Sequence, residues 1–321
     1  MSFSLWCDFI ENSFLDNEFL ELLKFGVNGA TSNPAIFKNA ILNSHIYKDK
    51  IAKLKGKKAK EIYEILAIED IQKAADKLAP LFFAKNDGFI SLEIDPRLWD
   101  NTSLSIGEAK RLYTTIGKEN VMMKIPATKA SYEVMFELMK SGINVNATLI
   151  FSLEQAKNCF NALNEGLKAF RIQNTTKTTP KAVISVFVSR FDRLLNSKLS
   201  EKNTLGILTS SLAYKYIYNQ NEPNIRTLFA STGVKGDDLP KDFYIKELLF
   251  ENSINTAPLD AINAFKGKEI NLKKPLSSSK IHKRISNLNL SQEELEQACK
   301  LLLDDGLNQF CIAFEEILKA L

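Results

Sequence analysis

The sequence is poor in histidine. Among its 321 residues only His45 and His282 are histidines, and neither lies in a recognisable motif at the end of a predicted strand. This scarcity argues against a histidine-rich metal site and against hydrolysis by a serine, histidine and aspartate triad. A reaction run by lysine and carboxylate side chains is more plausible, and we expect no bound metal.

Closely spaced cysteines and long apolar runs are also missing. The four cysteines form no C-x-x-C pair; they are Cys7, Cys159, Cys299 and Cys311. This spacing is typical of free thiols in a reducing compartment. No apolar run is long enough to span a membrane, and residues 1–12 lack the basic region that opens a secretory signal. We therefore expect a cytoplasmic protein without a membrane partner.

The chain has no strong excess of charge of one sign, since its formal net charge is +4. Basic residues are scattered, except in a tract from Lys266 to Arg284. This charge suits a protein that handles anionic metabolites, and it is far weaker than the basic footprint of a nucleic-acid-binding protein. We expect small anionic substrates and no nucleic-acid partner.

Two nucleotide-binding motifs, G-x-G-x-x-G and the P-loop, are absent, which weakens a doubly wound fold. Two-residue hairpin signals are absent as well. Short apolar segments instead alternate with helical patterns, and the eight strands they predict lie at or end near residues 3–9, 29–34, 88–95, 121–126, 144–151, 182–190, 227–231 and 253–256. Eight such units predict a (β/α)8 TIM barrel. The length would also allow two domains, but barrels of this kind often use it for one.

The helices between these strands are predicted from apolar spacing, with a long helical stretch at residues 35–81 and a plausible N-cap at Ser152. After the last strand, residues 266–290 read as a basic linker, which most often is solvated but could also help to attract a phosphorylated substrate. Ser291 and Glu294 form the pattern of a capping box that opens a terminal helix over residues 291–319. We expect one barrel domain over residues 1–321, with this C-terminal helix packed on the barrel.

Lys124 is the unusual residue of its strand, because it interrupts the apolar run Val-Met-Met-Lys-Ile-Pro at residues 121–126. A lysine in such a run either extends its ammonium group to water or is held in a pocket of low dielectric constant. Most lysines near strand ends are simply solvated. In a pocket, however, a neutral amine is a nucleophile that condenses with a ketone or aldehyde to form a Schiff base.

Polar residues also stand near the ends of the other predicted strands, where barrels assemble their active sites. Besides Lys124, they are Asp8, Thr31, Asn33, Glu93, Asn146, Thr148, Ser185, Arg190 and Ser231. Together they offer an amine, two carboxylates for proton transfer, a hydroxyl to hold a water, amides for substrate hydroxyls and a guanidinium for phosphate. Each also has an ordinary structural reading as a cap, a packing residue or half of a surface ion pair; for Arg190 the partner would be Asp192 or Glu201. Their recurrence on successive strands favours a common site.

At these residues the sequence resembles the transaldolases. The similarity runs from about Trp6 to Phe265, and its segments are Thr31-Ser32-Asn33-Pro34, Glu93 in its strand, Met123-Lys124-Ile125-Pro126, residues 142–152 (GINVNATLIFS) and residues 185–190 (SVFVSR). Residues 230–235 (ASTGVK) and Asn255-Thr256-Ala257-Pro258 are similar to the longer bacterial branch of the family.

The resemblance implies an enzyme that transfers a three-carbon dihydroxyacetone unit between sugar phosphates without metal or cofactor, in the non-oxidative pentose phosphate pathway. The donor would be sedoheptulose 7-phosphate or fructose 6-phosphate, and the acceptor glyceraldehyde 3-phosphate or erythrose 4-phosphate. Lys124 would form the Schiff base, while Glu93, Asp8 and a water held by Thr148 would move protons. The implied substrate-binding residues are Asn33, Asn146, Thr31, Ser185, Phe187, Arg190, Ser231 and Lys235. We expect a monomer or a homodimer.

One departure concerns the phosphate site. Many transaldolases carry a second phosphate-binding arginine two residues after the serine that corresponds to Ser231, and Gly233 stands there in this chain. Lys235 is the candidate substitute, although lysine lacks the planar fork of arginine.

Three alternative functions remain open at this stage. An aldolase that releases free dihydroxyacetone would share the barrel and the lysine, although the resemblance implies that Glu93 and the apolar Phe187 favour transfer. An inert sugar-phosphate-binding barrel is opposed by the presence of both Lys124 and Glu93. A metal-dependent aldolase is opposed by the shortage of histidine.

Overall fold

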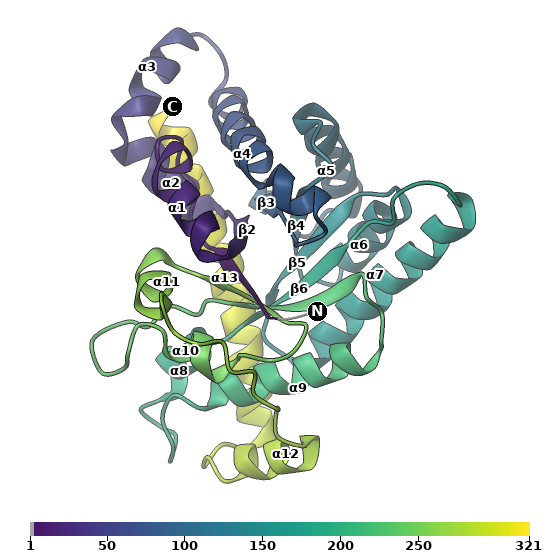
Figure 1. Ribbon diagram of the computed structural model, residues 1–321, viewed down its shortest axis with the longest axis vertical. Coiled ribbons are helices and arrows are strands. Elements are labelled where there is room, and N and C mark those ends of the chain that lie inside the picture. Colours follow the sequence, from purple (N-terminus) through teal and green to yellow (C-terminus); the bar gives the residue numbers. More distant parts are fainter. Residues whose placement is uncertain (1–2) are drawn as a thin grey trace.

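Eight parallel strands form the centre of the molecule. The computed structural model describes residues 3–321. Residues 1 and 2, which belong to the N-terminal stretch 1–12 discussed above for a secretory signal, lie outside the described residues. The strands are β1 (Ser4–Cys7), β2 (Val27–Thr31), β3 (Phe89–Glu93), β4 (Val121–Pro126), β5 (Asn144–Ile150), β6 (Ala182–Phe187), β7 (Ile225–Ala230) and β8 (Ile254–Ala257). They pair in sequence order, and β8 pairs with β1 to close a barrel. The predicted (β/α)8 TIM barrel is confirmed (Figure 1).

Helices follow the strands and cover the outside of the barrel. The α-helices are α1 (Glu18–Phe25), α2 (Pro34–Asn43), α3 (His45–Lys53), α4 (Ala59–Phe83), α5 (Thr102–Ile116), α6 (Ser131–Lys140), α7 (Leu153–Gln173), α8 (Ser189–Leu195), α9 (Leu205–Asn219), α10 (Phe243–Glu247), α11 (Leu259–Phe265), α12 (Ser278–Ser286) and α13 (Gln292–Ala320). Short 3-10 helices occur at η1 (Phe14–Asp16) and η2 (Pro96–Leu98). Among residues 3–321, no helix combines the length and the apolar character needed to cross a lipid bilayer.

Two predicted helix starts are confirmed by their hydrogen bonds. The Ser152 hydroxyl accepts from the Gln155 N–H at 3.0 Å, and the Gln155 side chain accepts from the Ser152 N–H at 3.2 Å. Ser291 and Glu294 form the same reciprocal pair at the start of α13. Each capping box satisfies N–H groups that the first turn of a helix leaves without a partner.

The helical stretch predicted over residues 35–81 is divided into α2, α3 and α4, because Ser44 is extended and Gly56 has a φ of +97°. Two other segments differ from the sequence prediction. The strand predicted to reach Arg190 ends at Phe187; Val188 has helical backbone angles, so Arg190 lies in the first turn of α8. Residues 266–290 contain α12, which packs its buried Ile281 and Ile285 inward.

The N-terminal end of the barrel is closed by a buried ion pair. Nη1 of Arg226 lies 2.6 Å from Oδ1 of Asp87, whose other oxygen accepts from the Trp6 indole N–H at 3.0 Å. The same guanidinium donates to the Ser4 hydroxyl at 3.0 Å. These polar groups form hydrogen bonds with one another and close this end of the barrel. In such barrels the active site lies at the opposite, C-terminal end.

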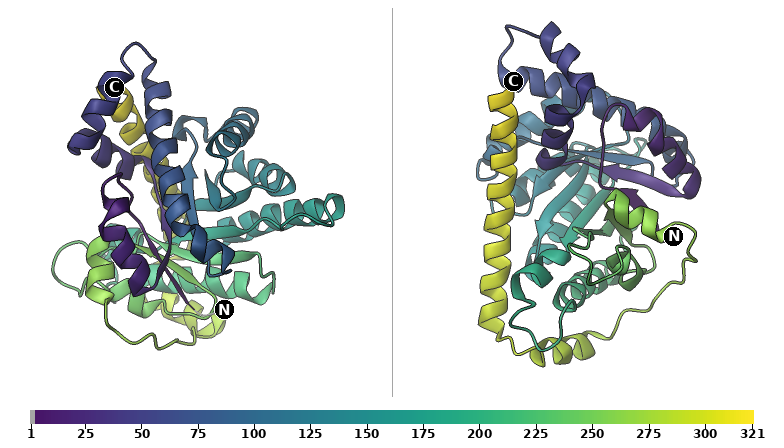
Figure 2. Two further views of the ribbon diagram at one scale, coloured as in Figure 1. Left: turned by 45° about the horizontal axis from the view of Figure 1, so that its top comes forward. Right: turned by 90° about the vertical axis from the view of Figure 1, so that its left-hand side faces the viewer.

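Helix α13 crosses that C-terminal end. Figure 2 shows it as a long straight helix along one side of the molecule, from α12 at one end to the region of α2 and α3 at the other. It packs against α2, α4, η2, α8 and β5, so it contacts elements from opposite sides of the barrel. The predicted C-terminal helix packed on the barrel is confirmed.

Candidate active site

The strand register brings three of the predicted residues side by side. Lys124 on β4 is the direct neighbour of Glu93 on β3 and of Asn146 on β5. Side chains alternate between the two faces of a strand, so residues paired in this way share a face. The amine, a carboxylate and an amide therefore lie next to one another at the C-terminal end of the barrel.

Lys124 does not extend its ammonium group to water, because the residue is only 5% exposed. Its Nζ donates to the carbonyl oxygen of Ser32 at 3.0 Å and lies 3.4 Å from Oε2 of Glu93. The ring of Phe310, on α13, lies 5.6 Å from the same nitrogen. Of the two readings of this lysine, the structure supports the one in which it is held in a pocket.

Glu93 is a carboxyl group that titrates near neutral pH. Burial raises its pKa to about 7, against the opposing effect of Lys124, while the negative charge of Asp8 adds to the increase. The ion pair at 3.4 Å is longer than a typical charge-assisted hydrogen bond. A carboxyl group with such a pKa accepts and donates protons readily at neutral pH.

Asp8 directly follows β1 and is held by a chain of hydroxyl groups. Thr31 donates to its Oδ1 at 2.6 Å, and the hydroxyls of Thr31 and Thr256 lie 2.7 Å apart. Burial raises the pKa of Asp8, and the positive charge of Lys124 and the bond from Thr31 oppose this increase. The second carboxyl group thus lies within the electrostatic field of the amine.

Thr148 is fully buried on β5, and its hydroxyl has no hydrogen-bond partner in the described part of the chain. The β5–β6 register shifts between Ala147 and Ile150, and Leu149 has a φ of +58°. A positive φ is unfavourable for leucine, so the strand is locally distorted beside the site. A buried hydroxyl without a protein partner is a suitable anchor for a water molecule or a substrate group.

Asn146 and Ser185 form a fixed polar pair inside the barrel. The Ser185 hydroxyl donates to Oδ1 of Asn146 at 2.6 Å, and Nδ2 of Asn146 donates to the Ser91 hydroxyl at 2.9 Å. An amide nitrogen carries two hydrogens, so one remains for a further acceptor.

Asn33 lies at the start of α2, where its Oδ1 caps the helix by accepting from the Ile36 N–H at 3.0 Å. Asn33 therefore caps the helix through its oxygen, and within residues 3–321 its amide nitrogen makes no hydrogen bond.

Arg190 is positioned at the edge of the site by an aromatic ring and an acidic side chain. Its guanidinium carbon lies 5.4 Å from the centre of the Phe187 ring, and Nη1 lies 3.6 Å from Oδ2 of Asp305. Within residues 3–321, neither its Nε nor its Nη1 makes a hydrogen bond. Burial and the neighbouring Arg193 lower the pKa of Arg190. Because a buried guanidinium with free N–H groups needs an acceptor, this one suits a phosphate.

The surroundings of Arg190 include a second hydroxyl and a cavity. Ser231, which follows β7 with a φ of +54°, lies with its hydroxyl 3.0 Å from that of Ser189. A cavity of about 370 Å³ opens between α8 and α13; it is lined by Arg190, Arg193, Leu194, Leu301, Leu302, Asp305 and Gln309. The alternative reading of Arg190 as half of a surface ion pair with Asp192 or Glu201 is wrong, because Asp192 accepts from Tyr244, Glu201 pairs with Arg284 and Arg190 itself lies beside Asp305.

Lys235 makes no contact of this kind with Arg190 or Ser231 in the described part of the chain. It is exposed in the loop after β7, and none of the ion pairs or side-chain hydrogen bonds found in residues 3–321 includes it. Gly233 lies close to Pro258, since a Cβ there would be 3.0 Å from the proline Cγ. A larger side chain at position 233 would press against this proline.

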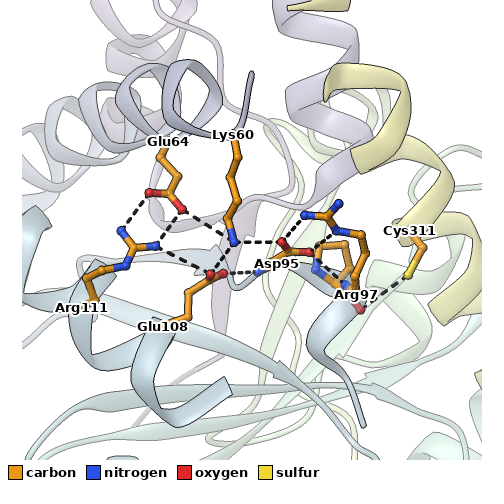
Figure 3. Close-up of polar contacts among 8 residues, drawn as sticks. Lys60, Glu64, Asp95, Arg97, Glu108, Arg111 and Cys311 are labelled. Carbon is orange, nitrogen blue, oxygen red and sulfur yellow. Dashed lines mark hydrogen bonds and ion pairs between the residues drawn. The ribbon is translucent and has the colours of Figure 1, made fainter. Parts of the chain in front are cut away.

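A charged network supports the segment that follows Glu93. Asp95 binds Arg97 at 2.6 Å and Lys60 at 2.9 Å, and Lys60 also lies 2.6 Å from Glu108. Figure 3 shows this network extending to Arg111 on one side and, on the other, Cys311 of α13 in contact with the turn at η2. The network joins α4, α5 and η2, so the chain just beyond Glu93 is held in place from several directions.

The structure adds residues that sequence reasoning missed. Ser32 contributes a backbone carbonyl, which has no sequence signal, and Ser91 lies in the interior of its strand. Phe310 looks like an ordinary apolar position of a helix far along the chain. Only the position of α13 across the barrel reveals its contact with Lys124.

Comparison with known proteins gives consistent matches over the full chain. A family model described as Transaldolase/Fructose-6-phosphate aldolase matches residues 5–321. A relative named Transaldolase from Campylobacter jejuni subsp. jejuni serotype O:23/36 (strain 81-176) is 74% identical over 325 residues, which covers 100% of this chain and 99% of the relative. A relative with the same name from Helicobacter pylori (strain P12) is 46% identical, with 99% of each chain covered.

Proposed function

Because this chain belongs to the transaldolase/fructose-6-phosphate aldolase family, we propose that it is a transaldolase that works through a Schiff base on Lys124. Its donor is a ketose phosphate such as sedoheptulose 7-phosphate or fructose 6-phosphate, and its acceptor is an aldose phosphate such as glyceraldehyde 3-phosphate or erythrose 4-phosphate. The observation that carries the proposal is the buried Lys124 ammonium between the Ser32 carbonyl and a carboxyl group whose pKa is about 7.

The first step joins the donor to the enzyme. The neutral Lys124 amine attacks the ketone carbon, and the resulting carbinolamine loses water to give a protonated imine. Glu93 and a water held by Thr148 supply and remove the protons of this dehydration. The lone hydroxyl of Thr148 and the raised pKa of Glu93 suit these two groups to the task.

The second step breaks the carbon–carbon bond. Asp8 removes the proton of the hydroxyl on the fourth carbon, the aldose leaves as an aldehyde, and the electron pair of the broken bond moves into the imine to form an enamine. Reversal of these steps with the acceptor aldehyde forms the new bond, and hydrolysis of the imine then frees the amine. Nearby Lys124 stabilises the Asp8 carboxylate that begins this step.

The remaining predicted residues orient the substrates. Asn33 and Asn146 each keep an amide N–H for the hydroxyls of the dihydroxyacetone unit, and Ser185 holds the Asn146 side chain. Arg190 binds the phosphate with the help of Ser231, and Thr31 acts through its bond to Asp8. We also propose that the enzyme is a single barrel domain, works in the cytoplasm without a nucleic-acid partner, and is a monomer or a homodimer.

Reduction with borohydride tests the central step, because it converts a Schiff base into a stable amine. The protein is incubated with fructose 6-phosphate and borohydride, and the labelled peptide is identified by mass spectrometry. We expect label on Lys124, none in Lys124→Met, and unchanged label in the control Lys129→Met, whose lysine is exposed on the same segment. A folded protein that takes no label, or takes it elsewhere, contradicts the proposal and favours an inert barrel.

The closest alternative is an aldolase that releases free dihydroxyacetone, an activity that the description of the matching family also includes. Phe187 argues for transfer, because a buried phenylalanine ring has no proton to donate to an enamine. We expect negligible release of dihydroxyacetone from fructose 6-phosphate when no aldose acceptor is present. Release at a rate comparable to transfer would assign the aldolase activity instead.

A further inference from the structure

Helix α13 contacts the walls of the site at successive turns as it crosses the barrel. Asp305 lies 3.6 Å from Arg190, and the Phe310 ring lies 5.6 Å from the Lys124 nitrogen. One residue further, the Cys311 thiol contacts the Pro96 carbonyl at 3.5 Å. The helix therefore covers the groups assigned to phosphate binding and to Schiff-base formation with a single rigid element.

The close approach of α13 depends on a glycine. A Cβ at Gly306 would lie 2.8 Å from Cδ2 of Leu149 and 3.5 Å from Nη1 of Arg190. Leu149 is the residue with a positive φ in the distorted part of β5, so its side chain meets the helix at this glycine. Phe310 lies four residues further along, one turn away on the same face of α13, and this brings its ring to the depth of Lys124.

Both sides of this contact are anchored. Beyond Phe310, the Phe314 ring receives the Arg97 guanidinium at 5.0 Å and packs edge-on against Tyr63 at 4.9 Å. Arg97 belongs to the charged network that follows Glu93, and Figure 3 shows Cys311 of α13 reaching the same turn. Because the helix is fixed before and after Phe310, the backbone that carries the ring cannot move away from Lys124 without breaking these contacts.

Phe310 brings no polar group to the amine. It is only 6% exposed and belongs to the same buried apolar cluster as Phe187 and Leu149. The Lys124 ammonium is thus bounded by two acceptors, Ser32 O and Glu93, and by an aromatic ring. A ring at this distance attracts a cation and also excludes water from that side.

We propose that Phe310 is a positioning residue that holds the Lys124 amine and its enamine away from water, so that the bound three-carbon unit is passed to an aldehyde. This inference rests on the proposed transaldolase function. If water reaches the enamine, the nucleophilic carbon of the enamine takes a proton from water. This protonation converts the enamine back into an imine. A second water then hydrolyses the imine, which releases free dihydroxyacetone and restores the amine.

The test compares variants of the full chain at two phenylalanines of α13. Phe310→Ala opens the space over Lys124, Phe310→Leu keeps an apolar side chain there, and Phe314→Leu is the control one turn away that does not contact the amine. For each folded variant, the rate of dihydroxyacetone release and the rate of transfer to erythrose 4-phosphate are measured from fructose 6-phosphate, and Lys124 is trapped with borohydride.

We expect Phe310→Ala to increase the ratio of release to transfer by about tenfold or more, with Phe310→Leu intermediate. Phe314→Leu, which weakens one anchor of α13 but keeps the Phe310 ring, should increase the ratio much less than Phe310→Ala. An unchanged ratio in Phe310→Ala, with Lys124 still trapped, contradicts the role of Phe310 and leaves the Schiff base intact. An equal increase in Phe314→Leu assigns the effect to general loosening of α13 and also overturns the proposal. Failure of trapping in the wild type instead contradicts the proposed function itself.

Discussion

Oε2 of Glu93 lies 3.4 Å from Nζ of Lys124, and the register of β3 and β4 makes the two residues direct neighbours. Both are buried, and the carboxyl group has a pKa of about 7. Near neutral pH the Glu93 carboxyl group therefore exists in both protonation states, and proton transfer between it and its surroundings needs little free energy.

Replacing Glu93 by Gln removes this proton exchange while preserving the size of the side chain. We expect kcat to fall by about 10²-fold or more, because the carbinolamine loses the group that assists its dehydration. Borohydride trapping still reaches Lys124, but more slowly. Steady-state kinetics and the rate of trapping measure the effect, and an unchanged kcat would exclude Glu93 from proton transfer.

The same pKa predicts how stability depends on pH. Since the folded pKa of Glu93, about 7, lies above the ordinary value of 4.5, the folded protein holds a proton that the unfolded chain releases between these values. The stabilising contribution is fully present below about pH 4.5 and is lost as pH rises through about 7. We expect the decrease in Tm between about pH 5 and about pH 8 to be smaller in Glu93→Gln than in the wild type. Equal decreases would show that Glu93 does not carry this titration.

Nε and Nη1 of Arg190, which make no hydrogen bond within the described part of the chain, predict a role in binding phosphate. In Arg190→Lys the charge remains but the planar fork is lost, so we expect KM for fructose 6-phosphate to rise by about tenfold or more. Turnover of unphosphorylated fructose, which has no group for this site, should change little. A similar loss for both sugars would assign Arg190 a structural role.

Lys235 provides a sharper test of the phosphate site because it is exposed in the loop after β7. If it closes on the substrate in place of a second arginine, Lys235→Ala raises KM for sugar phosphates more than it lowers kcat. Lys241→Ala is a suitable control in the same loop region, since that lysine is bound to the Gly236 carbonyl. An unchanged KM in Lys235→Ala would remove this residue from the site.

Gly206, in the first turn of α9, is required for close packing against the end of β6. A Cβ there would lie 2.2 Å from the carbonyl oxygen of Val188, and a backbone oxygen cannot move away cheaply. We expect Gly206→Ala to lower the free energy of unfolding by about 2 kcal/mol or more. In the control Gly107→Ala, within α5, nothing lies within 4 Å of the new methyl group, so stability rises by about 0.5–1 kcal/mol. Urea denaturation measures both changes.

The sequence was sufficient to predict the barrel because its strands are short apolar segments that end in polar residues. In a parallel barrel all such ends meet at one rim, which is why Lys124, Glu93 and Asn146 could be expected together from their positions in the chain alone. Arg190 shows the limit of this reasoning. Val186 and Val188, which precede Arg190, continue the alternating apolar pattern of the strand. The sequence pattern therefore does not show that α8 starts before Arg190.

Contacts made by the backbone or by remote elements could not be predicted. The carbonyl of Ser32 binds Lys124 regardless of the side chain at that position, so no residue type signals it. The distortion of β5 at Leu149, whose side chain lies close to Gly306 of α13, likewise runs against local preference, since leucine disfavours a positive φ. Phe310 meets Lys124 only because a helix that begins after the last strand returns across the barrel.

The position of α13 in the chain order has a consequence for synthesis. All eight strands, and with them Lys124 and Glu93, leave the ribosome before the helix that covers them. A nascent chain that has closed its barrel but has not yet formed α13 therefore lacks the Phe310 ring beside Lys124, because that turn follows the last strand in the chain. Chains interrupted between β8 and this turn would carry Lys124 without the ring, so the contact between Phe310 and Lys124 reports that synthesis has passed this point.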